Sequence, residues 1–422
     1  MSTARWIAFA ALLAALLAAG VALVNTHGDQ AALEADLAAA ETALREDDAP
    51  RAAAIARSVL AREPALGRAF GILARAEDGQ GDAAADRARY QAAARRAPRD
   101  PQVRGWLATQ ALQSGDFAAA ADHLDALLTV APAQRSDLLK LIAELAQDQD
   151  FADALASHLL QRPQWRQAIL RAATASRLST AADNLHGALR AEGGLAGDEA
   201  ARWIDGMLRD GRWGSAYARW VSGLADPPAR LPVPWNGSFG RPPSSAGFDW
   251  RVRRTPGVLV QRIELDRPVP ATAAGPGPAE PADPARHAAR LRFLGRPVAN
   301  TGLEVPLLLA PGQHLLQLRA RTRDLRSDQG LEWTLTCGDG RTRIASGARI
   351  RESRDWAALE LPFTVPEGEG CQGQWLRLVN PAPRGVAQIL RGELDITAVA
   401  ITQPPAAAPD AEPRTPAAAM AR

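Results

Sequence analysis

The sequence has little of several residues on which catalysis and ligand binding often depend. Lysine occurs once, at Lys140, and there are two cysteines and six histidines among 422 residues. The chain has no Gly-Lys pair of a phosphate-binding loop, no Gly-x-Ser-x-Gly and no His-x-x-x-His. Its formal net charge of +2 provides no overall field for nucleic acid. These absences predict a protein that is not an enzyme, holds no metal or other cofactor, and binds no nucleic acid.

Two pairs of carboxylates keep one enzymatic alternative open. Asp324 with Asp328, and Glu352 with Asp355, could supply the acid and base of a glycan-cleaving enzyme. Both pairs fall in expected loops, where solvated turns explain them better. A glycan-cleaving enzyme is therefore the less favoured alternative to a protein without catalytic residues.

The longest uncharged run is at the N-terminus. Residues Trp6 to Val24 carry no charge over 19 positions, which as a helix span about 28 Å, close to the hydrocarbon thickness of a bilayer. Arg5 precedes the run and acidic residues follow it, so the positive-inside bias places the rest of the chain outside the cytoplasm. Residues 1–30 are thus predicted to anchor the chain in a bacterial inner membrane, with its bulk in the periplasm. A signal peptide cleaved near Gly20, giving a secreted protein, is the alternative.

Both cysteines lie toward the C-terminal end of the chain, at Cys337 and Cys371. An even pair of cysteines in an exported protein usually forms a disulfide, because that compartment is oxidising. The sequence therefore predicts a Cys337–Cys371 disulfide, with two buried free thiols as the alternative.

A repeat of 34 residues organises the chain after the N-terminal run. Pro64, Pro98 and Pro132 are each 34 positions apart. Alignment on these prolines brings other residues into shared columns: Ala52, Asp86 and Ala120; Ala56, Tyr90 and Leu124; and Val59, Ala93 and Leu127. Small residues let two antiparallel helices cross closely, and proline ends the second helix of a pair. The period therefore predicts stacked helix pairs.

This pattern resembles the tetratricopeptide repeat, and the resemblance covers residues 31–230. It implies an all-α solenoid whose concave surface binds a protein partner. Four tryptophans could line such a surface, although packing between repeats is their commoner role: Trp106, Trp165, Trp203 and Trp213.

Past residue 230 the hydrophobic period changes from 3.6 to 2, which predicts a change from helices to strands. Short alternating runs bounded by Pro, Gly or Asn indicate an all-β sandwich over residues 231–402, with Trp250 and Trp333 in its core. The Pro- and Ala-rich stretch 267–286 is expected to be a flexible insertion, and residues 403–422 a disordered tail.

The ends of this second region resemble jelly-roll modules of the galactose-binding-like superfamily, which includes several carbohydrate-binding modules. Those modules often begin Asn-Gly-x-Phe-Glu and continue to a tryptophan; Asn236 to Phe239 and Trp250 match. Asp395 resembles the aspartate of their final strand. Gly240 stands where the modules carry a glutamate that helps to hold a structural calcium, so no calcium is expected. The resemblance implies a jelly-roll fold and suggests a glycan ligand.

Two kinds of side chain are candidate ligand contacts in the sandwich. Trp356 and Trp375 are the aromatic candidates, since a flat ring can stack on a sugar, with plain packing as the alternative. A row of arginines on one strand face could pair with the carboxylates or phosphates of an acidic polysaccharide, with a solvated sheet face as the alternative: Arg319, Arg321 and Arg323.

Together these features predict a non-enzymatic adaptor of the cell envelope. The helical repeats would bind an envelope protein, and the sandwich would bind a glycan or a second protein. The expected setting is the synthesis or export of a surface polysaccharide. A purely protein–protein scaffold with a structural sandwich is the main alternative.

Overall fold

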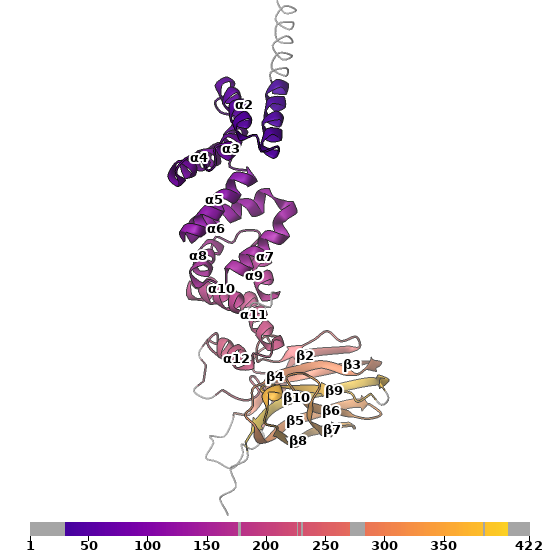
Figure 1. Cartoon of the computed structure of the whole chain (residues 1–422). Helices are drawn as coiled ribbons and strands as arrows, with labels where there is room; N and C mark the ends of the chain where they lie inside the picture. Colours follow the sequence, from indigo (N-terminus) through magenta and orange to yellow (C-terminus); the bar gives the residue numbers. More distant parts are fainter. Residues whose placement is uncertain are drawn as a thin grey trace, which may run out of the picture. The chain divides into compact units, whose positions relative to one another are not determined.

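The structure is a computed structural model (Figure 1), and the chain divides into two compact units, Met1–Leu195 and Ala196–Arg422. It describes residues 30–403 apart from 176–178, 226, 229–230, 271–282 and 383–384. Within this described part, no helix combines the length and apolar character needed to span a membrane. Apart from residues 30 and 403, the anchor expected over 1–30 and the tail expected over 403–422 lie outside the described residues, so both stay predictions.

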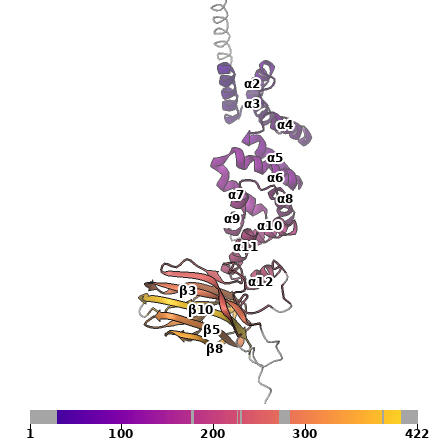
Figure 2. The same cartoon turned by 180° about the vertical axis from the view of Figure 1, so that it is seen from behind.

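The first unit is built from helices that pack in pairs (Figures 1 and 2). Residues 30–45 form the first described helical segment. The helices that follow are α2 (Ala49–Arg62), α3 (Gly67–Ala76), α4 (Ala83–Arg96), α5 (Pro101–Ser114), α6 (Phe117–Val130), α7 (Arg135–Leu145), α8 (Gln149–Leu159), α9 (Arg166–Ala175) and α10 (Ser179–Ala191).

The 34-residue period reappears in the starting points of the helices. Helices α2, α4 and α6 begin at residues 49, 83 and 117, and α3, α5 and α7 begin at 67, 101 and 135. An aspartate precedes α2, α4 and α6 and accepts a hydrogen bond from the backbone N–H three residues later, which satisfies a donor that the helix itself leaves open. These caps are Asp48, Asp82 and Asp116.

The aligned columns lie inside this unit, as the repeat predicts. Ala56, Tyr90 and Leu124 are buried at the same position of successive helices. The second helix of each pair ends two residues before its proline, since α2, α4 and α6 end at residues 62, 96 and 130. The tetratricopeptide-type arrangement of helix pairs is therefore confirmed.

The second unit begins with two helices, α11 (Gly197–Arg209) and α12 (Trp213–Val221), and continues into strands. The sequence pattern grouped these helices with the repeats and set the domain change at residues 230 and 231. The change from helix to strand does fall between Val221 and Arg251, but α11 and α12 belong to the same compact unit as the strands.

The strands form an antiparallel sandwich. They are β1 (Arg251–Val252), β2 (Val258–Val269), β3 (Ala285–Val298), β4 (Asn300–Leu307), β5 (Gly312–Arg326), β6 (Leu331–Cys337), β7 (Arg343–Ile350), β8 (Arg354–Val365), β9 (Gln374–Val379) and β10 (Gln388–Thr402). Sheet A has the order β1-β4-β9-β6-β7, and sheet B the order β2-β3-β10-β5-β8. Strands β3, β10, β5 and β8 of sheet B lie side by side in Figure 2.

Both ends of the stretch 267–286 are strand and not a flexible insertion, because β2 continues through Val269 and β3 begins at Ala285. Residues 271–282 lie outside the described part of the chain.

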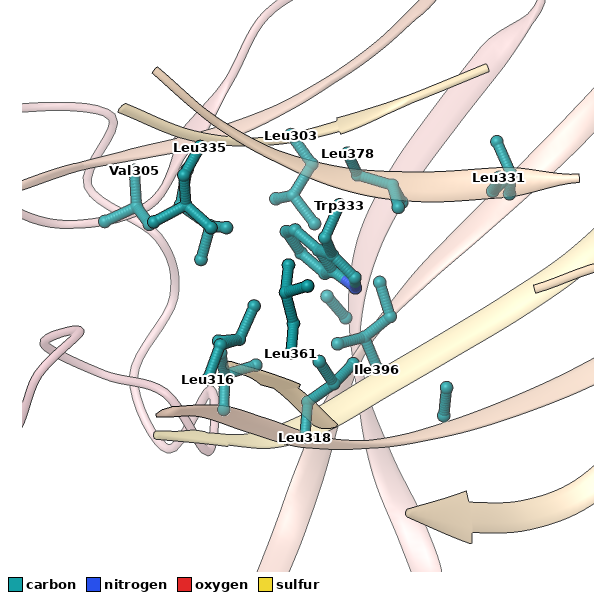
Figure 3. Packing of buried hydrophobic residues seen from close by; sticks show 14 of the residues in the cluster. Leu303, Val305, Leu316, Leu318, Leu331, Trp333, Leu335, Leu361, Leu378 and Ile396 are labelled. Carbon is teal, nitrogen blue, oxygen red and sulfur yellow. The ribbon is translucent and has the colours of Figure 1, made fainter. Parts of the chain in front are cut away.

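The sandwich core fills the space between the two sheets. Trp333 of β6 points into it, among Leu303 and Leu378 of sheet A and Leu318 and Ile396 of sheet B (Figure 3). Trp250 and Trp333 are both fully buried, which confirms their expected core positions.

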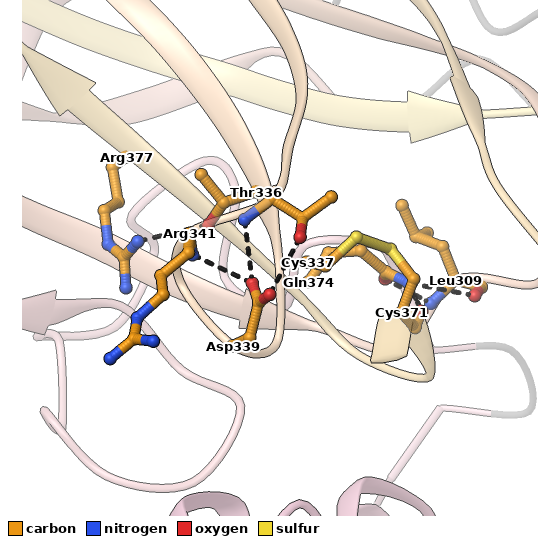
Figure 4. Close-up of a disulfide and its surroundings, with 9 residues drawn as sticks. Leu309, Thr336, Cys337, Asp339, Arg341, Cys371, Gln374 and Arg377 are labelled. Carbon is orange, nitrogen blue, oxygen red and sulfur yellow. Dashed lines mark hydrogen bonds between the residues drawn. A yellow bond between two sulfur atoms is a disulfide. The ribbon is translucent and has the colours of Figure 1, made fainter. Parts of the chain in front are cut away.

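One end of the core is closed by the predicted disulfide (Figure 4). Cys337 ends β6, and Cys371 ends the short helix η2 (Glu369–Cys371) that precedes β9. The buried Gln374 side chain accepts a hydrogen bond from the Leu309 backbone and donates one to the Cys371 carbonyl. The disulfide and these hydrogen bonds connect the ends of β4, β6 and β9.

Candidate binding surfaces

The helical unit has an open groove of about 500 Å³. It is formed by residues of the helical segment 30–45, the start of α2, α3 and α5. Its lining combines charged, polar and apolar side chains: Glu41, Leu44, Arg45, Asp47, Ala49, Arg75 and Gln102.

Several polar and charged residues in and beside this groove stand in shared columns of the repeat. Glu34, Arg68 and Gln102 stand in one 34-residue column, and Glu41 and Arg75 in another. Arg68 forms ion pairs with Glu34 at 2.8 Å and Glu41 at 2.9 Å. The hydrogen bond from Arg68 lowers the pKa of the Glu41 carboxyl, so Glu41 keeps its negative charge. The sequence analysis did not single out these residues, although the same 34-residue alignment contains the signal.

The four tryptophans considered for the concave surface serve mainly in packing. Trp165, Trp203 and Trp213 are buried. Trp106 stacks on Tyr90 with 3.9 Å between ring centroids and donates its indole N–H to Asp78. All three rings therefore serve in packing, although the Trp213 ring packs on Trp375 and Phe248 and not between repeats.

On sheet B, the candidate arginines share the outer face with acidic residues of β10. Arg321 lies opposite Asp395, and Arg323 opposite Glu393. The Asp395 carboxylate is buried and receives hydrogen bonds from both Arg290 and Arg321, with shortest distances of 2.7 Å. Arg323 stands 3.8 Å from Glu393.

Burial alone would raise the pKa of Asp395, but the hydrogen bonds from Arg290 and Arg321 outweigh it and lower that pKa below its usual value. Asp395, which resembles the final-strand aspartate of the carbohydrate-binding modules, is thus held as an anion by two guanidinium groups. Throughout the described residues, no three His, Cys, Asp or Glu side chains gather as a metal site would require.

Arg319 differs from its two neighbours in the row. Its Nε is buried without a hydrogen-bond partner, and no ion pair compensates the guanidinium among the described residues. The half-exposed Trp356 of β8 lies close by on the same face, with the Arg321 guanidinium 4.8 Å from its ring centroid. Strand register places Arg319 opposite Ala358, two residues from Trp356, so the uncompensated charge and the aromatic ring share the outer face of sheet B.

Sheet A carries a polar row that the sequence analysis missed. Arg251, Glu304, Arg377 and Thr334 follow one another in register across β1, β4, β9 and β6. Arg377 donates to the buried Glu304 at 2.9 Å. It also donates to Thr336 at 3.2 Å (Figure 4). A glutamate between two apolar strand residues is the only sequence signal for this row.

Trp375, the second aromatic candidate, is half-buried on this face. The Arg251 and Arg377 guanidinium groups lie 5.2 and 5.1 Å from its ring centroid, and Trp213 of α12 meets it edge-on at 5.7 Å. Much of the ring is therefore occupied by side chains of the same unit.

The two carboxylate pairs considered for catalysis do not form an enclosed site. Asp324, Asp328, Glu352 and Asp355 are all exposed. The expectation that both pairs lie in loops is wrong for one member of each pair, because Asp324 lies in β5 and Asp355 in β8, where its carboxylate accepts a hydrogen bond from the Trp356 backbone.

No protein-family model matches the sequence, and no curated protein matches it either. Similar solved structures include carbohydrate-binding modules, tetratricopeptide repeat proteins, an α-L-arabinofuranosidase and a bacteriophage tailspike protein. A carbohydrate-binding module, CBM4, covers 40% of this chain and 97% of its own, at 10% identity and a TM-score of 0.27. A tetratricopeptide repeat protein from Parabacteroides merdae covers 46% of this chain and 80% of its own, at 16% identity and a TM-score of 0.23. The module TmCBM61, solved with β-1,4-galactotriose, covers 36% and 88%, at 11% identity and a TM-score of 0.22.

Proposed function

We propose that the protein is a non-enzymatic adaptor of a bacterial cell envelope, in which the helical unit binds a protein and the sandwich binds a glycan. The proposed setting is the synthesis or export of a surface polysaccharide, with the chain anchored in the inner membrane and both units in the periplasm. The Cys337–Cys371 disulfide supports an oxidising compartment, although it does not identify the envelope process.

The observation that carries the protein-binding half is the open groove on the helical unit. Arg45 and Arg75 line it, and they donate hydrogen bonds to the Thr42 hydroxyl and to the Gly71 carbonyl. Leu44 adds apolar surface between them. Glu41 and Asp47 also line the groove, so the segment that fits is one whose acidic side chains meet Arg45 and Arg75, because guanidinium groups pair well with carboxylates.

The glycan-binding half is supported by Trp356 and Arg319 on sheet B. A half-exposed ring offers a stacking surface, and the uncompensated Arg319 guanidinium suits a sugar carboxylate. The ligand class is therefore an acidic polysaccharide, such as one that contains uronic acids.

Affinity electrophoresis of residues 30–403 through alginate tests the glycan half. The wild type should be retarded by alginate and not by neutral dextran, and the double variant Trp356→Ala, Arg319→Gln should lose the retardation. Arg343→Gln removes an exposed charge from sheet A and is the matched control. Retardation that survives in the double variant contradicts the site. The absence of retardation in any acidic polysaccharide favours the purely protein–protein scaffold.

Binding of acidic peptides from an immobilised library tests the groove. Arg45→Glu with Arg75→Glu should abolish it, while Arg87→Glu with Arg95→Glu, on the exposed side of α4, should leave it unchanged. Equal loss of peptide binding in both double variants would show a general effect of charge and not binding in the groove.

A further inference from the structure

Four large aliphatic side chains are exposed together toward one end of sheet B. They form the aliphatic patch: Leu259 at 44% exposure, Leu294 at 53%, Val386 at 61% and Ile389 at 62%. Strand register places Leu259, Leu294 and Ile389 near one another. Leu259 of β2 lies opposite Arg292 of β3, so Leu294 is its diagonal neighbour two residues along.

Strand β10 extends the patch on the other side of β3. Ile389 lies opposite Pro297, and Arg391 lies opposite Leu294, so Ile389 is again a diagonal neighbour of Leu294. Val386 precedes β10 by two residues, and its carbonyl accepts a hydrogen bond from the Gln388 side chain. Exposed apolar side chains that cluster in this way usually mark an interaction surface.

Positive charge borders this patch. Arg391 faces Leu294 on one side and Arg326 of β5 on the other. Like charges directly opposite each other destabilise a sheet unless an anion lies between them. Arg254, Arg296, Arg326 and Arg391 are exposed, and none of the four forms an ion pair within the described part of the chain.

We propose that the aliphatic patch docks on an anionic lipid surface. Its leucine and isoleucine side chains would enter the boundary between headgroups and acyl chains, and Arg326 and Arg391 would pair with lipid phosphates. A glycan fits this surface poorly, because the patch offers no aromatic ring for stacking. The interaction is additional to the proposed adaptor role and to the N-terminal anchor.

Vesicle co-sedimentation of residues 30–403 tests the proposal. This stretch omits the predicted anchor and contains the described cores of both units. The protein should sediment with vesicles that contain phosphatidylglycerol and not with pure phosphatidylcholine, and the binding should fall with added salt. Leu294→Ser with Ile389→Ser, and separately Arg326→Gln with Arg391→Gln, should each weaken it by at least about tenfold.

Two matched controls distinguish binding at this site from nonspecific binding to vesicles. Arg341→Gln with Arg343→Gln removes two exposed charges near β7 of sheet A, and Leu141→Ser with Leu160→Ser removes exposed leucines of the helical unit. Both should bind like the wild type. The patch variants should still be retarded by alginate. Loss of vesicle binding can then be distinguished from loss of glycan binding.

Equal binding to neutral vesicles, or unchanged binding by both patch variants, overturns the proposal. An acidic protein would then be the next occupant to examine.

Discussion

At the scale of single residues, Asp395 is the central anion on the outer face of sheet B, where it binds Arg290 and Arg321. Alternation along one strand predicts that Arg319, Arg321 and Arg323 share a face, and the strand register agrees. The alternation cannot predict that the charge of Arg321 is neutralised, because its partner Asp395 lies 74 residues away in the sequence. Pairing across strands depends on a register that no local pattern contains.

Replacement of Asp395 by asparagine should destabilise the sandwich by about 3 kcal/mol, since it leaves Arg290 and Arg321 without their shared counter-charge. The more exposed Glu393 forms longer contacts, so Glu393→Gln should cost only about 1 kcal/mol. Urea unfolding followed by circular dichroism measures both. Equal costs for the two variants would contradict the assigned importance of the Asp395 cluster.

The same carboxylate predicts a dependence of stability on pH. The pKa of Asp395 is lower in the folded protein than its usual value of 3.8, so its contribution is fully present above that value. The contribution is lost as the pH falls through the lower folded-state pKa. The wild type should therefore lose its stability advantage over Asp395→Asn in strongly acidic solution. An advantage that persists there would be inconsistent with this assignment.

At the scale of elements, the helix pairs could be predicted because their signals are local. Proline spacing and small-residue columns repeat every 34 residues, and Asp48, Asp82 and Asp116 repeat with them as caps. The grouping of α11 and α12 with the sandwich could not be predicted in the same way. Nothing in the sequence near Trp213 shows what that side chain packs against.

The cap residue Asp116 allows a direct test of the repeat. Asp116→Ala should lower the stability of the helical unit by about 1 kcal/mol, because the Ala119 N–H loses its acceptor. Asp116→Asn keeps a capping oxygen and should cost much less. Thermal unfolding of both variants would show the difference, and equal shifts would argue against a capping role.

The packing of α12 on the sandwich makes a second prediction at this scale. A Cβ added at Gly373 would lie 1.9 Å from Trp213 Cδ2, whereas one at Gly370 would meet nothing within 4 Å. Gly373→Ala should therefore lower the melting temperature of the second unit markedly, and Gly370→Ala should leave it nearly unchanged. Trp213→Ala should cost about 3 kcal/mol or more, since the ring is buried. A sandwich that melts normally in Trp213→Ala would show that α12 is not part of its fold.

At the scale of the whole molecule, two separately packed units carry two different kinds of surface. The helical groove is built from residues of Met1–Leu195, and the Trp356–Arg319 face from residues of Ala196–Arg422. The sequence predicts this division into helix pairs and a sandwich, since hydrophobic period is a property of each segment. It does not predict the groove lining or the ion pairs, which require segments distant in the chain to be placed together.

The most direct test of the adaptor role is to ask whether the two surfaces act independently. Alginate retardation should be lost in Trp356→Ala, Arg319→Gln and retained in Arg45→Glu, Arg75→Glu, whereas acidic-peptide binding should show the opposite pattern. Loss of both activities in either variant, or retention of both in both variants, would contradict the account.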